Sequence, residues 1–317
     1  MKVSVIIPLC NKSATIERTL ASIRAQTFTD YEVIVIDDGS TDDGPEKVQR
    51  RTEIRLLSQP NAGPGAARNR GIREAQGELL AFLDADDEWL PDYLNQSVSL
   101  LEKSGSETAS VTSGYVEWPG EKTTEPLWAR RGLTSGVHRL TPQTDPLLAV
   151  HMLAFMSPWS TLVRADVIRE LGGFFDRQRC LYAEDAFLWL KVLLRYPVAF
   201  QMSPPLVRYH TEASDLARNL RGPRPIEPFL LFPEEIENVC PESMRELLRN
   251  ILAVRALKTA CMLGYWGQWR QASELRKRFR TRGMWRLPYY LPAMICSTPL
   301  GGILGAACRL RLGVGRR

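Results

Sequence analysis

The sequence has few of the residues that build zinc-stabilised or disulfide-linked folds. Among 317 residues there are three histidines and six cysteines, and the cysteines stand at positions 10, 180, 240, 261, 296 and 308. No pair of cysteines has C-x-x-C spacing, and no histidine lies at a spacing typical of a zinc ligand. The pattern argues against a structural zinc site. We expect reduced, mostly buried thiols, as in cytosolic proteins.

The N-terminus lacks the long apolar run of a signal peptide. Residues 1–9 are apolar, but a signal peptide needs a longer apolar core and a cleavage site. The alternation of Val3, Val5 and Ile7 before Pro8 predicts a first buried strand instead. Internal repeats and low-complexity segments are also missing. The composition, 44% hydrophobic and 24% charged, is that of a globular protein of one large domain or two smaller ones.

Acidic residues are scarce near the C-terminus. Residues 241–317 hold 15 Lys or Arg against 3 Asp or Glu, a net charge of +12, so the first 240 residues sum to −7 within a chain total of +5. Such asymmetry predicts that the basic region meets an acidic surface, either nucleic acid or anionic lipid. The region does not interleave aromatic and basic residues as a single-strand platform would, so no nucleic-acid partner is expected.

An apolar stretch lies inside this basic region, at residues 287–308. A membrane-spanning helix needs ~20 apolar residues, so the length would permit one. Prolines at 288, 292 and 299 and the Gly301–Gly302 pair argue against a straight helix, and basic residues flank both ends. We predict an element that enters and leaves one anionic leaflet of a membrane, or lies in its interface. A soluble helical subdomain is the alternative.

The first hundred residues alternate between strand-like and helix-like patterns. Strands are expected at 3–8, 31–37, 54–58 and 79–83, and helices at 15–26, 64–75 and 91–104. Repeated strand–helix units predict a parallel sheet with helices on its faces, and ligands of such sheets bind beyond the carboxyl ends of the strands. Residues 109–150 show a weak pattern, which we interpret as a variable excursion. Further elements are expected at 160–163, 166–171, 184–195, 198–202 and 206–209.

Acidic residues follow two of the expected strands. Asp37 and Asp38 come directly after the second strand, where they fit a solvated turn but can also bind a base and a ribose. Residues 84–88 hold four acids in five positions after the strand at 79–83. Crowded carboxylates raise one another's pKa unless a cation lies among them, and Mg²⁺ is often held by one or two carboxylates plus substrate phosphates. The spacing of Asp84 and Asp86 therefore predicts a metal site, with a solvated loop as the alternative.

A third acidic pair, Glu184 and Asp185, opens the helix expected at 184–195. Carboxylates are favoured at a helix N-terminus by the helix dipole and by capping, so the pair fits a structural role. It also fits a general base at the edge of a cleft.

Taken in order, these clusters and the segments around them resemble the inverting family 2 glycosyltransferases of the GT-A fold, over residues 3–219. The matching segments are SVIIP (4–8), NK (11–12), SI (22–23), QTF (26–28), IDDGSTD (36–42), NAGPGAARNRGI (61–72), LDADD (83–87), PD (91–92), LGGF (171–174) and ED (184–185). Each segment alone is weak evidence, but together and in register they are specific.

The resemblance implies an α/β fold of GT-A type, with a central, mostly parallel sheet flanked by helices. It implies a catalytic domain at residues 1–220, followed by a basic, mostly helical region at 221–317. The implied activity is transfer of a sugar from a nucleotide-sugar, as a family-level expectation a UDP-sugar, to an acceptor hydroxyl. Mg²⁺ or Mn²⁺ would be the cofactor. Bacterial-type polysaccharide or surface-glycan synthesis, with a glycan or lipid-linked acceptor, is the expected setting, in the cytoplasm or on the cytoplasmic face of the membrane. A non-catalytic nucleotide-sugar-binding protein and a metal-dependent nucleotidyltransferase are the alternatives.

The resemblance also implies roles for individual residues. Those expected to bind the nucleotide-sugar are Pro8, Leu9, Asn11, Asp37, Asp38, Arg68, Asp84 and Ala85. Asp86 is expected to hold the metal, and Asp185 to be the base with Glu184 as its alternative. His210 stands where relatives often have a histidine, and the choice between a metal ligand and a partly buried structural residue stays open. Cys10 departs from the family, where many relatives have an aromatic residue that stacks on the base.

Overall fold

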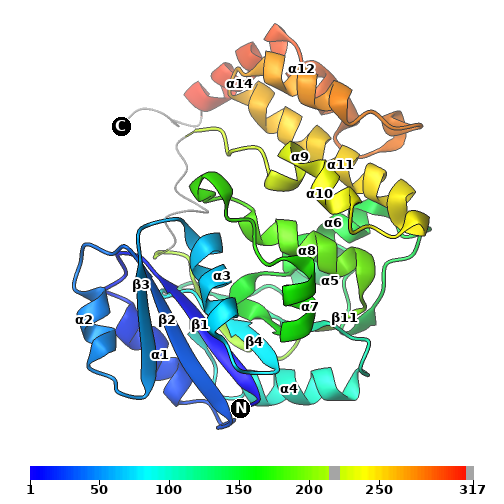
Figure 1. Cartoon of the computed structure of the whole chain (residues 1–317). Coiled ribbons are helices and arrows are strands. Elements are labelled where there is room, and N and C mark those ends of the chain that lie inside the picture. The colour runs from blue at the N-terminus through cyan, green and yellow to red at the C-terminus, as the bar shows by residue number, and fades with distance from the viewer. Residues whose placement is uncertain (214–221, 312–317) are drawn as a thin grey trace. The chain divides into compact units, whose positions relative to one another are not determined.

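The computed structural model describes residues 1–213 and 222–311 (Figure 1). The chain forms two compact units, one of residues 1–140 and 151–214 and the other of residues 141–150 and 215–317. No pattern in the sequence predicted that residues 141–150 belong to the second unit.

The first unit is built on an eight-stranded sheet. Its strands, in spatial order, are β3 (Ile54–Gln59), β2 (Tyr31–Asp38), β1 (Val3–Leu9), β4 (Leu79–Phe82), β10 (Thr161–Arg164), β6 (Ser110–Ser113), β11 (Val198–Gln201) and β9 (Gly136–His138). Only β10 and β9 run against the others. The expected mostly parallel α/β sheet is confirmed.

Alternating side chains of β1 bind helices to both faces of this sheet. Val5 and Ile7 belong to one apolar core with residues of α1 (Ile16–Arg24) and α2 (Gly44–Gln49). Ile6 points the other way and meets Gly71 of α3 (Pro64–Glu74). Figure 1 shows α3 in front of the strands and α1 behind them. This period-two pattern is what the sequence predicted for a strand buried on both faces.

The segment at 109–150 is more regular than its sequence pattern indicated. It supplies β6 and β9 to the large sheet, together with α5 (Glu125–Arg130) and α6 (Pro146–Phe155). It also supplies β7 (Tyr115–Trp118) and β8 (Lys122–Thr123) to a second sheet of order β5–β12–β7–β8, with β5 at Glu88–Trp89 and β12 at Val207–His210. The strands are only two to four residues long, too short for a periodic signal. The remaining elements of this unit are α4 (Tyr93–Lys103), α7 (Ala165–Leu171), α8 (Glu184–Arg195) and the 3₁₀ turns at Pro158–Ser160 and Arg177–Arg179.

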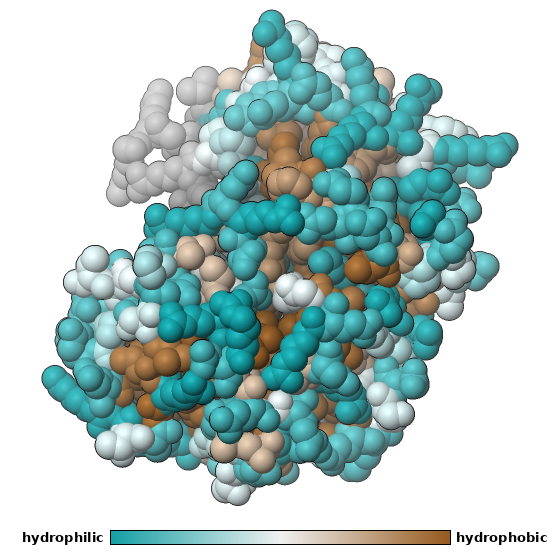
Figure 2. Space-filling view, viewed as in Figure 1, coloured by the Kyte–Doolittle hydropathy of each residue, from teal (hydrophilic) through white to brown (hydrophobic). Residues whose placement is uncertain are grey.

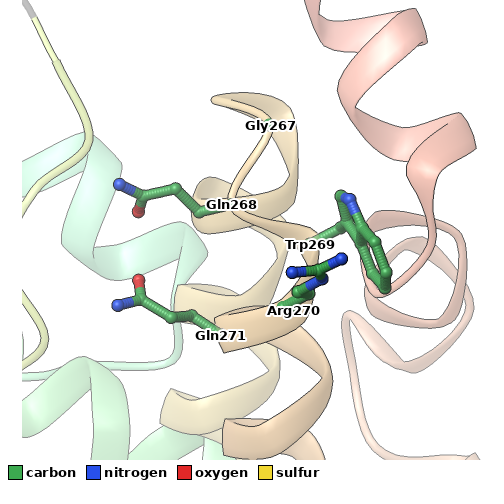
Figure 3. Close-up of a pocket in the computed structure, with 5 residues that line it drawn as sticks. All are labelled: Gly267, Gln268, Trp269, Arg270 and Gln271. Carbon is green, nitrogen blue, oxygen red and sulfur yellow. The ribbon is translucent and has the colours of Figure 1, made fainter.

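The second unit is helical. Its elements are α9 (Pro228–Leu231), α10 (Pro233–Glu237), α11 (Arg245–Tyr265), α12 (Trp269–Arg278), α13 (Tyr290–Cys296) and α14 (Pro299–Arg311), with 3₁₀ turns at Glu242–Met244 and Met284–Arg286. A hollow lies where α11 gives way to α12 (Figure 3). Gln268 and Gln271 point to one side of this hollow, and Arg270 lies over the Trp269 ring on the other side. The polar groups that line the hollow therefore do not converge on one point.

The cysteines are all free thiols, as expected, but the expectation that they are mostly buried is wrong. Cys240 is buried, Cys308 is exposed, and the other four are half-buried. On the face shown in Figure 2, several apolar areas lie between hydrophilic ones.

We predict that Gly71→Ala lowers the free energy of unfolding by about 1–3 kcal/mol, because the new methyl group collides with the Ile6 side chain. Gly120→Ala is the matched control: nothing lies within 4 Å of a Cβ at that position, so its effect should stay within about 0.5 kcal/mol. Urea titration of the two variants beside the parent protein measures the difference. Equal midpoints for the two variants would contradict the close approach of α3 to β1.

Candidate active site

The carboxyl ends of β1 and β2 form one edge of the site. Pro8 and Leu9 of β1 pair with Ile36 and Asp37 of β2 in parallel register. The loop that follows β2 is bound to the loop that follows β1, because the side-chain oxygen of Asn11 accepts a hydrogen bond from the Thr41 amide at 2.7 Å. The Asn11 backbone has φ of 52°, the left-handed conformation that asparagine tolerates better than most residues.

Asp38 is 3% exposed and organises the next loop. One carboxylate oxygen accepts hydrogen bonds from Gln59 Nε2 at 2.8 Å and from the Ala62 amide at 2.9 Å, and the other accepts from the Gly63 amide at 2.9 Å. Asp37 accepts from the Ser40 amide at 2.9 Å. The expected contact of Asp38 with the edge of a nucleotide base stays a prediction. In that contact, the base would bind carboxylate oxygens that already accept three hydrogen bonds from the protein.

The acidic loop at 84–88 is held by its backbone. Three side chains from the start of α1 donate to successive carbonyl oxygens: Thr15 to residue 85 at 2.7 Å, Arg18 to residue 86 at 2.8 Å, and Thr19 to residue 87 at 2.8 Å. Their spacing places all three on one face of the helix. Ala85 itself is 3% exposed, and its carbonyl oxygen is the acceptor for Thr15.

The carboxylates of this loop are crowded. Burial, and then the charge of Asp84, raise the pKa of Asp86, while Lys12 acts in the opposite direction. The Lys12 ammonium lies 2.9 Å from Asp86 Oδ2. Burial and the charge of Asp86 raise the pKa of Asp87 well above its usual range, and Asp87 accepts a bond from the His210 amide at 2.8 Å. The loop thus gathers four carboxyl groups, and Arg68, Lys12, Arg18 and Arg208 are their ion-pair partners.

Arg68, on α3, joins two parts of the site that are far apart in sequence. One guanidinium nitrogen lies 2.7 Å from Asp84 Oδ1 and another lies 2.8 Å from Glu184 Oε1. Its side chain is 5% exposed. Burial alone would lower its pKa, but the charges of Asp84 and Glu184 outweigh burial and raise it. The expectation placed Arg68 near the nucleotide, and in the structure both ends of its guanidinium bind protein carboxylates.

Asp185 is the second residue of α8, directly after Glu184 of this bridge. Ala183, the residue before the helix, has φ of 57°, which turns the chain sharply into the helix. Burial, followed by the negative charge of Glu184, raises the pKa of Asp185 to about 7, and Arg68 only partly opposes this. A carboxyl group with a pKa near neutrality can accept a proton and release it again at the pH of the cell.

His210 lies in β12 and is 2% exposed. Its Nδ1 is 2.7 Å from Glu212 Oε1 and its Nε2 is 2.6 Å from Glu88 Oε1. Both ring nitrogens thus face carboxylates, so metal ligation would require one of these contacts to break. The role of His210 as a ligand stays a prediction.

The structure therefore brings Arg68, Asp84, Glu184 and Asp185 together, and places Asp86 and Asp87 in the adjoining loop. Sequence reasoning missed Lys12, the ion-pair partner of Asp86. It also missed the α1 side chains that hold the loop. The spacing of positions 15, 18 and 19 on one helix face was the available signal.

The chain belongs to glycosyl transferase family 2, whose family model matches residues 4–171. An uncharacterized glycosyltransferase of Rickettsia felis is 28% identical over 214 residues, which are 66% of this chain and 34% of that protein. The succinoglycan biosynthesis protein ExoW of Rhizobium meliloti is 38% identical over 123 residues, 36% of this chain and 39% of ExoW. The chain thus spans about a third of the length of the first curated relatives that it matches.

Solved structures share the fold. TarS residues 1–349 of S. aureus, in complex with UDP-GlcNAc, superpose with a TM-score of 0.71 at 19% identity, covering 100% of this chain and 93% of that one. The mannosyltransferase PcManGT of Pyrobaculum calidifontis, in complex with GDP-Man and Mn²⁺, gives 0.55 at 20% identity, covering 97% and 86%. The expected GT-A fold and the expected family are both confirmed.

We predict that Arg68→Gln lowers the free energy of unfolding by about 3–5 kcal/mol, because it leaves the buried Glu184 and the half-buried Asp84 without their counter-charge. Arg73→Gln, on the exposed side of the same helix, should change it by less than about 0.5 kcal/mol. In Arg68→Gln/Glu184→Gln a large part of the loss should return. Chemical denaturation of the four proteins tests this, and a double variant no more stable than Arg68→Gln alone would show that the charge of Glu184 is not what Arg68 neutralises.

Proposed function

We propose that the chain is a metal-dependent, inverting glycosyltransferase that moves one sugar from a nucleotide-sugar donor to an acceptor hydroxyl. The observation that carries the proposal is the Arg68 bridge. It fixes Asp84, at the end of β4, beside the helix that begins with Glu184 and Asp185. A donor-binding carboxylate and a carboxyl group of near-neutral pKa thereby share one site.

We propose Pro8, Leu9, Asn11, Asp37, Asp38, Arg68, Asp84 and Ala85 as the residues around the donor. Their support is the position of the strand ends, where ligands of such sheets bind. Arg68 acts there by holding Asp84 in place. A UDP-sugar is the proposed donor, and the support is the UDP-GlcNAc complex of TarS, a protein of the same fold.

A divalent cation fits the acidic loop. Asp86 is 9% exposed, its pKa is raised by burial and by Asp84, and its oxygen donors suit Mg²⁺ or Mn²⁺. Among the residues that the structure describes, no group of three or more His, Cys, Asp or Glu side chains is placed to hold a metal. Asp86 would therefore hold the ion with help from donor phosphates, and His210 is proposed as a further ligand. When bound, such an ion stabilises negative charge on a leaving diphosphate; the complex of PcManGT with Mn²⁺ supports its use.

The proposed chemistry needs one proton transfer. The acceptor oxygen attacks the anomeric carbon from the face opposite the diphosphate, forming the new glycosidic bond as the bond to the diphosphate breaks. Asp185 takes the proton of the acceptor hydroxyl, and the nucleoside diphosphate leaves with the bonding electron pair. Glu184, tied to Arg68, holds the start of α8 in place. A non-catalytic binding protein, or a nucleotidyltransferase, would have no use for this base.

We propose polysaccharide or surface-glycan synthesis as the setting, with a glycan or lipid-linked acceptor. The role of ExoW in succinoglycan biosynthesis supports it. The basic C-terminal region supports action on the cytoplasmic face of an anionic membrane.

Asp86→Asn should abolish the part of nucleotide affinity that depends on the divalent cation, while the fold survives. Isothermal titration with UDP, with and without Mn²⁺, measures this, and Asp92→Asn, an exposed acid near the loop, is the control. If the parent protein binds UDP with the same affinity in the presence and absence of Mn²⁺, the proposed metal site is refuted.

Asp185→Asn should leave donor affinity near normal and lower turnover by at least ~10²-fold, the low end for loss of a general base. The parent's turnover should rise with pH through about 7, since the base must be ionised. If Glu184→Gln loses most of its turnover while Asp185→Asn keeps it, the general base is Glu184 and not Asp185.

The same carboxyl group should affect stability. Its pKa is higher in the folded than in the unfolded protein, so stability is complete below the unfolded value and is lost as pH rises through about 7. Asp185→Asn should therefore be more stable than the parent above pH 7, by on the order of 1–3 kcal/mol. A variant that is less stable there would show that the buried charge is compensated.

A further inference from the structure

Within the described residues, α13 and α14 are the last two helices, and both expose large apolar side chains. On α13, Leu291, Met294 and Ile295 are exposed by 72%, 37% and 45%, at the i, i+3, i+4 spacing of one helix face. On α14, Leu300, Ile303 and Leu304 repeat that spacing, with exposed fractions of 53%, 65% and 49%. Single exposed apolar residues are ordinary, but two adjacent helices with the same exposed triplet form a patch.

The inward faces of these helices are made of small residues. Ala293 is the buried residue of α13, and Gly301 and Gly305 are buried on α14. A Cβ on Gly305 would collide with the Tyr265 carbonyl of α11, and one on Gly264 of α11 would collide with the Cys296 carbonyl. The backbones therefore pack in direct contact. This arrangement reverses that of a water-facing helix, which buries its large apolar residues.

No single helix among residues 1–213 and 222–311 combines the length and the apolar content of a membrane span; α13 and the first part of α14 do so only as a pair, bent by 95°. The break falls among the prolines and glycines, as the sequence predicted. A bent pair of helices, each with an exposed apolar triplet, suits the surface of a bilayer better than its full thickness.

Charge identifies the partner of this surface. No acidic residue follows Glu274, whereas ten Lys or Arg do. Lys277, Arg280, Arg282 and Arg286 are exposed in the segment that leads into α13. A second copy of the chain would bring the same positive charge against itself, whereas an anionic lipid surface attracts it. Trp285, 64% exposed beside these residues, is a side chain typical of the headgroup level.

We infer that α13 and α14 dock the protein on anionic phospholipid, with the outward triplets among the acyl chains and the basic segment at the phosphates. The inference rests on the proposed membrane location and names the surface that makes the contact.

The test is binding of the full chain to vesicles of phosphatidylcholine alone and of phosphatidylcholine mixed with phosphatidylglycerol, measured by co-sedimentation. The parent should bind the anionic vesicles, and more weakly at high salt. Leu291→Gln/Ile303→Gln should bind about tenfold more weakly or worse, through loss of apolar burial. Arg280→Gln/Arg282→Gln should lose about fivefold per residue. Leu127→Gln, an exposed leucine in the first unit, should bind like the parent.

Several outcomes would overturn the inference. One is that the parent protein binds neither kind of vesicle. Another is that Leu291→Gln/Ile303→Gln binds the vesicles as well as the parent does. A third is that this variant changes its oligomeric state while its vesicle binding is unchanged. The last outcome would assign the face to a second copy. Titration of UDP into the same samples reports separately on the proposed function, so either can fail without the other.

Discussion

A single buried guanidinium holds the site together. Arg68 lies between carboxylates from two distant segments: it binds Asp84, which follows β4, and Glu184, which begins α8. The neighbouring residue extends the link: Asn69 exchanges two hydrogen bonds, each of 2.8 Å, with the backbone of Phe174, whose ring lies 5.3 Å from the Arg68 guanidinium. α3 thus fixes the approach to α8 through charge, amide and ring contacts at once.

The same bridge explains why two adjacent acids behave differently. Glu184 is paired with Arg68, whereas Asp185 receives burial and the repulsion of Glu184 with only part of the arginine's attraction. Of these two carboxyl groups adjacent in sequence, one is held in an ion pair and the other has a pKa near neutrality. Such a separation is how a site assigns different duties to chemically equal side chains.

Much of the fold could be predicted because its signals are local. The alternation in β1, the apolar runs of β2 and β4 and the turn after α3 each lie within a dozen residues. The positions of the acidic clusters followed from the same reasoning. The contacts among them did not, because Arg68 and Glu184 are separated by 116 positions and only the folded chain brings them together. The pairing of Lys12 with Asp86 was hidden for the same reason. The short strands at 110–138 had too few residues for a period, and the roles of Asp38, Asp86 and Asp185 remain predictions.

The hydrogen bonds from α1 to the acidic loop link substitutions on this helix to the geometry of the loop. Thr15, Arg18 and Thr19 donate to the carbonyl groups of residues 85–87, so the backbone of the loop cannot shift away from α1 without breaking three hydrogen bonds. A natural variant at one of these three positions would then alter the acidic loop, although the substituted residue carries no carboxylate and lies about seventy positions away in the sequence.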